Sequence, residues 1–250
     1  QSSLVSFSVG GQFEHRKEEH PNKNYPKSGF TVFGAHTDSP VPKVKPVSYI
    51  SKHNCEQVGV ELYGGGLWNT WFDRDLSIAG RVNIKENDTS YISKLVHIKQ
   101  PILRIPNLAI HLNRSIYDKG FKYNKEDHVV PVLASTIAAS LDSSTKDDET
   151  KTKTHAHSPL LINAICQELD ITDSQIEDFE LCLYDTQDAQ LGGMLSEFIH
   201  SRALDNLMMS FVSLSALIDS DDTLKTDTNI RVVCLFDNEE VGSRSEHGAD

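Results

Sequence analysis

The apolar run at residues 230–236 ends just before two adjacent acidic residues, Glu239 and Glu240. A run rich in β-branched residues and closed by polar residues and a glycine predicts a buried strand. In α/β proteins, ligand sites lie at the carboxyl ends of such strands. Neighbouring acids point in different directions, so one could bind a metal while the other transfers a proton. Because an isolated acidic pair is more often a solvated turn, this hypothesis needs partners elsewhere in the chain.

Two further polar elements supply such partners. His36 directly follows an apolar run at residues 30–35 that predicts another strand, and Asp38 comes two residues later. One imidazole nitrogen can bind zinc while a nearby carboxylate orients the ring. Asp205 lies near the start of a run whose apolar residues have helical spacing. The helix dipole favours an acidic residue at this position, and a simple helix-capping role is the alternative to metal binding. Together these residues make the His/Asp/Glu mixture that hydrolytic zinc sites use.

The chain resembles the aspartyl aminopeptidases, the M18 family of co-catalytic two-zinc metallopeptidases. The resemblance is carried, in family order, by the stretches 36–40 (HTDSP), 64–75 (GGGLWNTWFDRD), 104–111 (RIPNLAIH), 202–207 (RALDNL) and 237–243 (DNEEVGS). It implies an α/β fold, with a mixed-sheet metallopeptidase catalytic domain of the phosphorylase/hydrolase-like kind interrupted by an inserted β-rich dimerisation domain. We expect the catalytic domain at residues 1–39 and 188–250, and the insertion at residues 40–187.

The resemblance also implies a role for each residue of the site. His36 would bind one zinc ion, Glu240 would bind the other, and Asp205 would bridge the two. Glu239 would be the general base that activates the attacking water. Asp38 would be the partner that orients His36 from behind.

The same resemblance implies a substrate residue and an assembly. His111 would bind substrate and stabilise the developing oxyanion, and the dimerisation domain would offer it across a subunit interface. We expect a homo-oligomer built from dimers, with a dodecamer as the family's usual form. Each zinc would need one more ligand, an aspartate and a histidine that lie beyond Asp250, so we expect an internal fragment that is inactive by itself.

The expected function is hydrolysis of amino-terminal Asp and Glu residues from peptides by a cytoplasmic zinc aminopeptidase. The acidic preference rests on the resemblance alone, because no basic residue can be assigned to a pocket for an acidic side chain. A preference for neutral or basic residues therefore stays open. A non-catalytic homologue that acts as an oligomeric scaffold is the other alternative, although a scaffold has no physical need for this set of ligands.

The net charge, the lengths of the apolar runs and the cysteine pattern indicate which partners and which compartment to expect for the protein. The formal net charge of −12 argues against nucleic acid or an anionic membrane surface as the main partner. No apolar run approaches the roughly 20 residues of a membrane span. The four cysteines show no close pairing, which fits reduced, mostly buried thiols of an intracellular protein.

Periodicity predicts the remaining elements. Alternating apolar residues and turn signals indicate short strands, and a serine followed by proline indicates a helix start. We expect strands near residues 4–9, 58–62, 78–82, 108–112 and 179–183, and a helix at residues 159–169. Residues 15–27 predict a surface loop, and residues 142–158 have almost nothing to bury and predict a mobile segment.

Overall fold

The structure, a computed structural model, describes residues 2–14, 28–141 and 156–248. The predicted loop at 15–27 and most of the segment predicted at 142–158 lie outside the described residues. The chain divides into two compact units. Unit 1 is formed by Gln1–Ser39 together with Gln190–Asp250, and unit 2 is formed by Pro40–Ala189.

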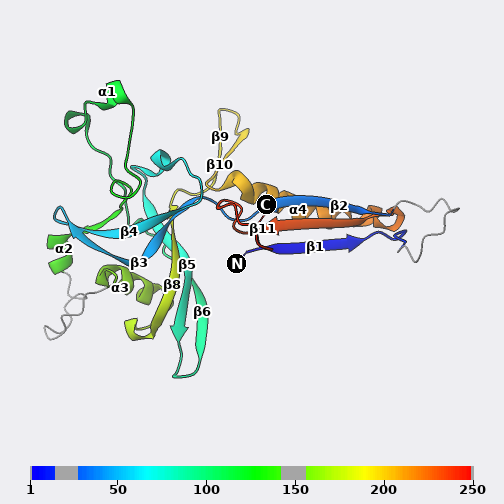
Figure 1. Ribbon diagram of the computed structural model, residues 1–250, viewed down its shortest axis with the longest axis horizontal. Helices are drawn as coiled ribbons and strands as arrows, with labels where there is room; N and C mark the ends of the chain where they lie inside the picture. Colours follow the sequence, from blue (N-terminus) through cyan, green and yellow to red (C-terminus); the bar gives the residue numbers. More distant parts are fainter. Residues whose placement is uncertain (1, 15–27, 142–155, 249–250) are drawn as a thin grey trace. The chain divides into compact units, whose positions relative to one another are not determined.

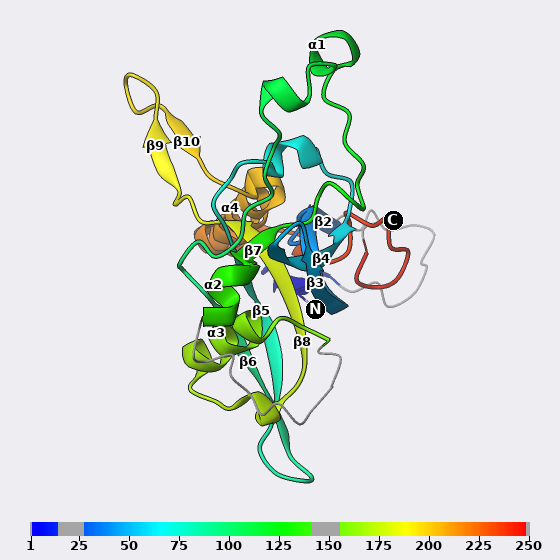
Figure 2. The same cartoon turned by 90° about the vertical axis from the view of Figure 1, so that its left-hand side faces the viewer.

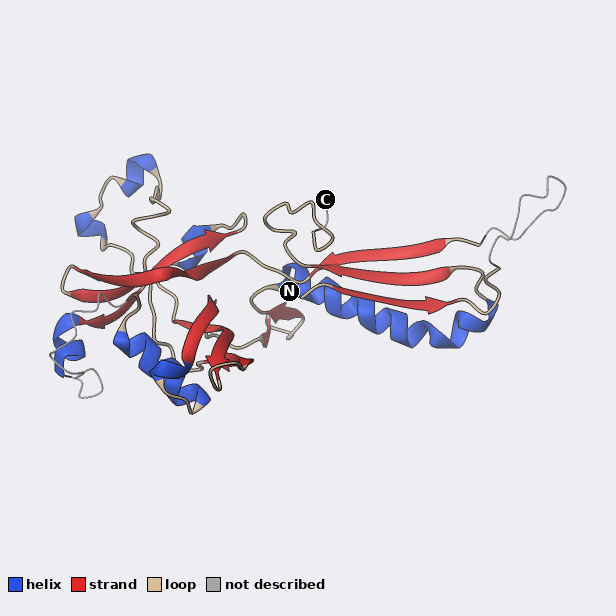
Figure 3. Cartoon of the chain, turned by 60° about the horizontal axis from the view of Figure 1, so that its bottom comes forward, coloured by secondary structure: helices blue, strands red, loops and turns tan. Residues whose placement is uncertain are grey.

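Unit 1 is built on a three-stranded mixed sheet in the order β1-β11-β2. These strands are Leu4–Val9, Ile230–Phe236 and Phe30–His36 respectively. β1 pairs with β11 antiparallel, whereas β11 pairs with β2 in parallel. The helix α4, Leu204–Asp219, runs along one face of this sheet (Figures 1 and 3). The predicted strands at both polar clusters and the predicted α/β class with a mixed sheet are therefore confirmed.

The two faces of this sheet differ in burial. Val233 and Leu235 of β11 are 1% and 6% exposed. On the opposite face, Val232 lies in register with Phe7 and Val32, which are 64% and 59% exposed. The prediction of fully buried strands is thus wrong for this face, which the helix does not cover. On the covered face, Phe33 of β2 pairs with Val233 and is still 57% exposed, so deep burial is confined to the central strand β11.

Three smaller elements complete the described part of unit 1. β9 and β10 form a short antiparallel hairpin, and a 3-10 helix follows α4 directly. Their bounds are Gln190–Gly192, Phe198–His200 and, for the 3-10 helix η5, Ser220–Thr226. α4 is the longest of the described helices, and none of them combines the length and the apolarity needed to cross a membrane.

Unit 2 contains a six-stranded antiparallel sheet in the order β6-β5-β8-β3-β4-β7. In chain order its strands are β3 Val41–Lys52, β4 Cys55–Tyr63, β5 Leu76–Lys85, β6 Tyr91–His97, β7 Val132–Ser135 and β8 Ile176–Asp185. Short helical elements connect them: η1 Trp68–Trp71, η2 Ile110–Leu112, α1 Ile116–Lys119, α2 Thr136–Leu141, α3 Pro159–Leu169 and η4 Asp173–Gln175.

The main hydrophobic core of the described residues lies in unit 2. Alternate residues of β5 point to one face, and Ile78, Val82 and Ile84 are at most 2% exposed. Leu161 and Ile165, four residues apart on α3, are fully buried in the same cluster. The predicted strands at 58–62, 78–82 and 179–183 and the predicted helix at 159–169 are therefore confirmed.

The predicted strand at 108–112 is wrong. Residues 110–112 form the 3-10 helix η2, and Leu108 and Leu112 are 61% and 75% exposed. The segment belongs to a long excursion that carries α1 away from the six-stranded sheet (Figures 1 and 2). Apolar alternation makes a strand only where a partner strand can take its backbone hydrogen bonds.

The cysteines are unpaired, as the sequence predicts, but they are less buried than expected. Cys55, Cys166, Cys182 and Cys234 are all half-buried and free. Partial burial nevertheless raises the pKa of the Cys182 thiol, with the nearby Glu180 carboxylate adding to the effect and Lys43 opposing it.

Candidate metal centre

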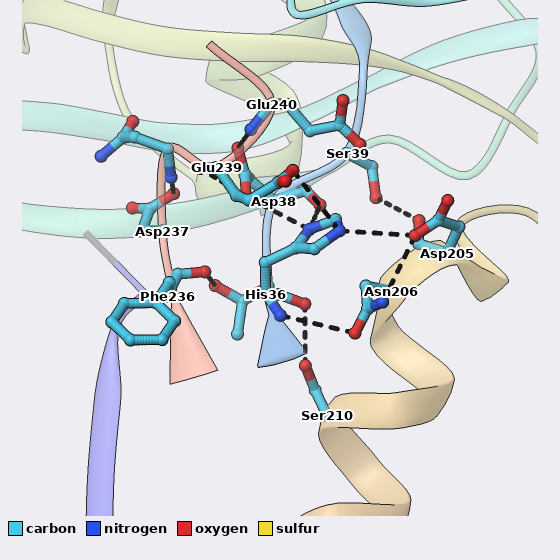
Figure 4. A network of polar contacts seen from close by, with 12 residues as sticks. His36, Asp38, Ser39, Asp205, Asn206, Ser210, Phe236, Asp237, Glu239 and Glu240 are labelled. Atoms are coloured by element: carbon cyan, nitrogen blue, oxygen red, sulfur yellow. Dashed lines mark hydrogen bonds and ion pairs between the residues drawn. The ribbon is translucent and has the colours of Figure 1, made fainter. Parts of the chain in front are cut away.

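The ends of two parallel strands bring the polar clusters together. Phe236 at the end of β11 lies in register with His36 at the end of β2, and the Thr37 N–H donates to the Phe236 carbonyl oxygen at 2.8 Å. The residues that follow both strands therefore leave the sheet at one edge. Asp205, at the start of α4, approaches the same edge (Figure 4).

Three side chains form a compact donor group at this edge. His36, Glu239 and Glu240 each offer one ligand atom, and these atoms lie within 4.8 Å of one another. The Nε2 atom of His36 is 3.6 Å from Oε2 of Glu239. Asp205 joins through the same nitrogen, with its Oδ1 atom 3.4 Å away. The His36 side chain is 12% exposed and that of Asp205 is 85% exposed, so the group lies at the surface with its imidazole sheltered.

Asp38 ties the imidazole and the acidic pair together. Its Oδ1 and Oδ2 atoms accept hydrogen bonds from the backbone N–H groups of Glu239 and Glu240 at 3.2 and 3.0 Å. The Nδ1 atom of His36 lies 3.4 Å from Oδ1 of Asp38 and 3.0 Å from its backbone oxygen. Since Nδ1 faces Asp38, Nε2 is the nitrogen that faces the carboxylates of Asp205 and Glu239.

The sequence pointed to Asp38 as an orienting partner of His36 but missed its bonds to the acidic pair. Those bonds join residues more than 200 positions apart. The available signal was the pattern of two apolar runs, each ending in an acidic motif, because parallel pairing of two such strands brings their ends together.

Two residues of α4 that sequence reasoning missed bind the backbone of His36. Asn206 Oδ1 accepts from the His36 N–H at 3.4 Å, and the Ser210 hydroxyl donates to the His36 carbonyl oxygen at 2.8 Å. The spacing of Asn206 and Ser210, four residues apart on the predicted helix, was the signal that could have grouped them.

The electrostatics of the group suit a cation. The pKa of the Glu240 carboxyl is raised, first by burial and then by the negative charges of Glu239, Asp38 and Asp205, while His36 acts in the opposite direction. A bound divalent ion would offset this repulsion. One imidazole nitrogen with several carboxylate oxygens is a donor set that zinc accepts, so the residues present fit zinc.

The remaining candidate residue, His111, belongs to unit 2. It lies on η2 and its side chain is exposed.

Asp73, Arg74 and Asp75 also belong to unit 2, where Arg74 pairs with Asp185 and Asp75 pairs with Arg104 at 2.7 Å. These ion pairs give the charged stretch after η1 a structural role.

Comparison with known proteins relates this chain to a protein family. The family model described as aminopeptidase I zinc metalloprotease (M18) matches residues 1–250. The aspartyl aminopeptidase of Dictyostelium discoideum is 46% identical over 263 aligned residues, which cover 100% of this chain and 52% of that protein. Aspartyl aminopeptidase 4 of Saccharomyces cerevisiae is 40% identical, with 100% of this chain and 50% of that protein covered. The chain thus spans about half the length of the curated relatives it matches.

Solved structures show the same relationship. A cryo-EM structure of the Ape4 and Nbr1 complex superposes with a TM-score of 0.84 at 40% identity, covering 99% of this chain and 45% of the other. The S. cerevisiae mApe1 dodecamer superposes with a TM-score of 0.71 at 28% identity, covering 99% of this chain and 50% of the other.

Proposed function

Because the chain belongs to the M18 family of aminopeptidase I zinc metalloproteases, we propose that the whole protein removes acidic residues, Asp or Glu, from the amino termini of peptides. The observation that carries the proposal is the convergence of four side chains: one atom each of His36, Glu239 and Glu240 lies within 4.8 Å of the others, and Asp205 Oδ1 lies 3.4 Å from His36 Nε2. The names of the curated relatives, aspartyl aminopeptidases, support the acidic preference.

His36, Asp205 and Glu240 are the residues that would hold two zinc ions, with Asp205 shared between them. When bound, zinc supplies Lewis acidity, which polarises a peptide carbonyl and lowers the pKa of water. Support comes from the sheltered imidazole of His36, whose Nε2 atom faces Asp205 Oδ1 at 3.4 Å. Asp38 would keep this nitrogen directed at the carboxylates by occupying the opposite side of the ring.

Glu239 is the proposed general base. Its carboxylate would take a proton from the attacking water as the water oxygen bonds to the peptide carbonyl carbon. The same carboxylate would then give the proton to the leaving nitrogen as the C–N bond breaks, so that one amino acid is released with a free amine on the shortened peptide. The 43% exposure of its side chain supports this role, because a base must reach both water and substrate. His111 would stabilise the oxyanion that develops between these steps.

Unit 2 is the proposed dimerisation domain, inserted into a metallopeptidase catalytic domain of the phosphorylase/hydrolase-like kind. Its position in the chain, between the two segments of unit 1, supports an insertion. The dodecamer named for S. cerevisiae mApe1 supports a homo-oligomer built from such dimers. The four unpaired cysteines support a reducing compartment, and we propose the cytoplasm.

The test compares two substitutions in the full-length protein, each of which replaces a carboxylate with an uncharged amide of similar size. Glu239→Gln should keep zinc but lose most turnover of a peptide that begins with Asp, since removal of a general base costs about 10²–10⁴-fold in rate. Glu240→Gln should lose zinc from one site. Glu246→Gln, an exposed acid of unit 1, is the matched control and should change neither quantity.

Two outcomes would count against the proposal. Equal loss of zinc in Glu239→Gln and Glu240→Gln would refute the division of roles within the acidic pair. A wild-type protein that holds no zinc and releases no amino-terminal residues would refute the enzyme and favour the scaffold.

A further inference from the structure

His36 ends strand β2 of the small sheet. Within residues 2–14, 28–141 and 156–248 this sheet has the order β1-β11-β2, so β2 pairs with a strand on its β11 side only. The hydrogen bond from the Thr37 N–H to Phe236 shows which peptide groups point toward β11. Since backbone groups alternate between the two sides of a strand, the N–H and C=O groups of His36 point away from β11.

Two side chains of α4 bind the backbone groups of His36 on the side away from β11. The Ser210 hydroxyl donates to the His36 carbonyl oxygen at 2.8 Å, and Asn206 Oδ1 accepts from the His36 N–H at 3.4 Å. Ser210 is only 6% exposed, so this contact is shielded from competing water. Figure 4 shows both side chains reaching from the helix to the strand end.

Asn206 also contacts a second candidate ligand. Its Nδ2 group donates to Asp205 Oδ1 at 3.4 Å, so one amide side chain connects the backbone of His36 with the carboxylate of Asp205. Both bonds of Asn206 are longer than the usual 2.7–3.2 Å, whereas the Ser210 bond is of ordinary length. Ser210 should therefore contribute more to the placement of His36.

We propose that Ser210 and Asn206 are positioning residues that hold His36 in the orientation needed to bind zinc, a role that rests on the proposed function above. The helix that carries Asp205 at its start also fixes the strand end that carries His36. One helix therefore sets the placement of His36 relative to Asp205, through hydrogen bonds between its side chains and the His36 backbone. A movement of α4 against β2 would change the positions of both candidate ligands together.

The experiment measures zinc affinity and apo-protein stability in the full-length protein. Ser210→Ala should lower zinc affinity about ten-fold, the lower end of the effect seen when a group that supports a metal ligand is removed. Asn206→Ala should lower it by a smaller factor. Ser213→Ala makes the same serine-to-alanine change one turn along α4 and should keep wild-type affinity. Ser210→Thr keeps a hydroxyl and should restore most of the affinity that Ser210→Ala loses.

Zinc affinity is measured by competition with a chelator of known affinity, and apo stability by urea unfolding after zinc removal. A purely structural bond would lower apo stability while leaving the zinc affinity of the folded protein unchanged. If Ser210→Ala does not fold, the comparison of Asn206→Ala with Ser213→Ala decides the question. Wild-type zinc affinity in the folded variants would overturn this proposal alone, whereas a wild-type protein without zinc would overturn the proposed function as well.

Discussion

The Oδ2 atom of Asp38 accepts a hydrogen bond from the backbone N–H of Glu240 at 3.0 Å, and this bond joins the segment after β2 to the turn after β11. The Asp38 side chain is 7% exposed, so little water competes for it. Hydrogen bonds to a charged acceptor in such a position are stronger than neutral ones. The placement of Glu239 and Glu240 therefore depends on Asp38. The spacing of Asp38 from His36 in the sequence indicates only that Asp38 orients the imidazole.

Asp38→Asn should weaken zinc binding in the full-length protein by about 10–100-fold, the range for loss of a group that supports metal ligands. The amide keeps one acceptor oxygen, so only one of the two backbone N–H groups would retain its partner. Isothermal titration with zinc measures the change. Asp237→Asn is the control, because Asp237 binds Asn238 and Ser2 and lies outside the donor group. Equal effects of the two substitutions would contradict a special role for Asp38.

Removal of zinc should abolish peptide hydrolysis and be reversible. Dialysis of the full-length protein against a chelator should stop release of amino-terminal Asp, and added zinc should restore it, because the chelator removes the ion and leaves the candidate ligands His36, Asp205 and Glu240 chemically unchanged. His36→Ala should not recover at zinc concentrations that restore the wild type. Measurement of the amino acid released per minute checks both results, and activity that survives complete zinc removal would contradict the proposed centre.

The ion pair between Lys43 and Glu180 should make a small, pH-dependent contribution to the stability of unit 2. The hydrogen bond from Lys43 Nζ to Glu180 Oε1, 2.7 Å long, lowers the pKa of Glu180, and the charges of Lys43 and Arg81 act in the same direction against burial. Because the folded pKa lies below the unfolded one, this stability is present above the unfolded pKa and is lost as pH falls through the folded pKa. Both side chains are partly exposed, so Glu180→Gln should cost at most about 1 kcal/mol at pH 7.

Urea unfolding of wild type and Glu180→Gln at pH 7 and at pH 3 measures this contribution. The difference between the two proteins should be present at pH 7 and shrink as the pH is lowered, because the carboxylate gains its proton as the pH falls through its lowered pKa. Glu177→Gln on the same strand is the matched control. An unchanged difference at the lower pH would rule out the ion pair as its source.

Ile78→Ala should destabilise unit 2 by about 2–5 kcal/mol, the usual cost of truncating a fully buried isoleucine to alanine. Ile78 is 0% exposed in the main core, whereas Leu95 on the neighbouring strand β6 is 81% exposed. Leu95→Ala should therefore change stability by less than about 0.5 kcal/mol. Chemical denaturation of both variants tests the assignment of the core, and a larger loss in Leu95→Ala would contradict it.

Much of the local structure could be predicted from the sequence, because periodicity is a local property. The strands that end at His36 and before Glu239, and the helix that starts near Asp205, follow from apolar spacing. The same spacing misled at residues 108–112, where the chain forms a 3-10 helix instead of a strand. Spacing reports which side of an element is apolar, and it carries no information on whether a partner strand is present.

The burial of individual side chains in the three-stranded sheet also could not be predicted from the sequence. Phe30 and Val233 both belong to apolar runs that predict strands, yet Phe30 is 69% exposed and Val233 is 1% exposed. The difference arises because α4 covers one face of the three-stranded sheet and because β11 is its central strand, and both are properties of packing between distant segments.

By itself the sequence determined the chemical types of the candidate site, the local elements that carry them and the family to which the chain belongs. Only the tertiary structure decided that Asp38 holds the backbone of Glu239 and Glu240, and that Ser210 holds that of His36. These bonds span 201, 202 and 174 positions of the chain. They exist because β2 and β11 pair in parallel and α4 packs beside them, and such pairing depends on long-range contacts that no local pattern encodes.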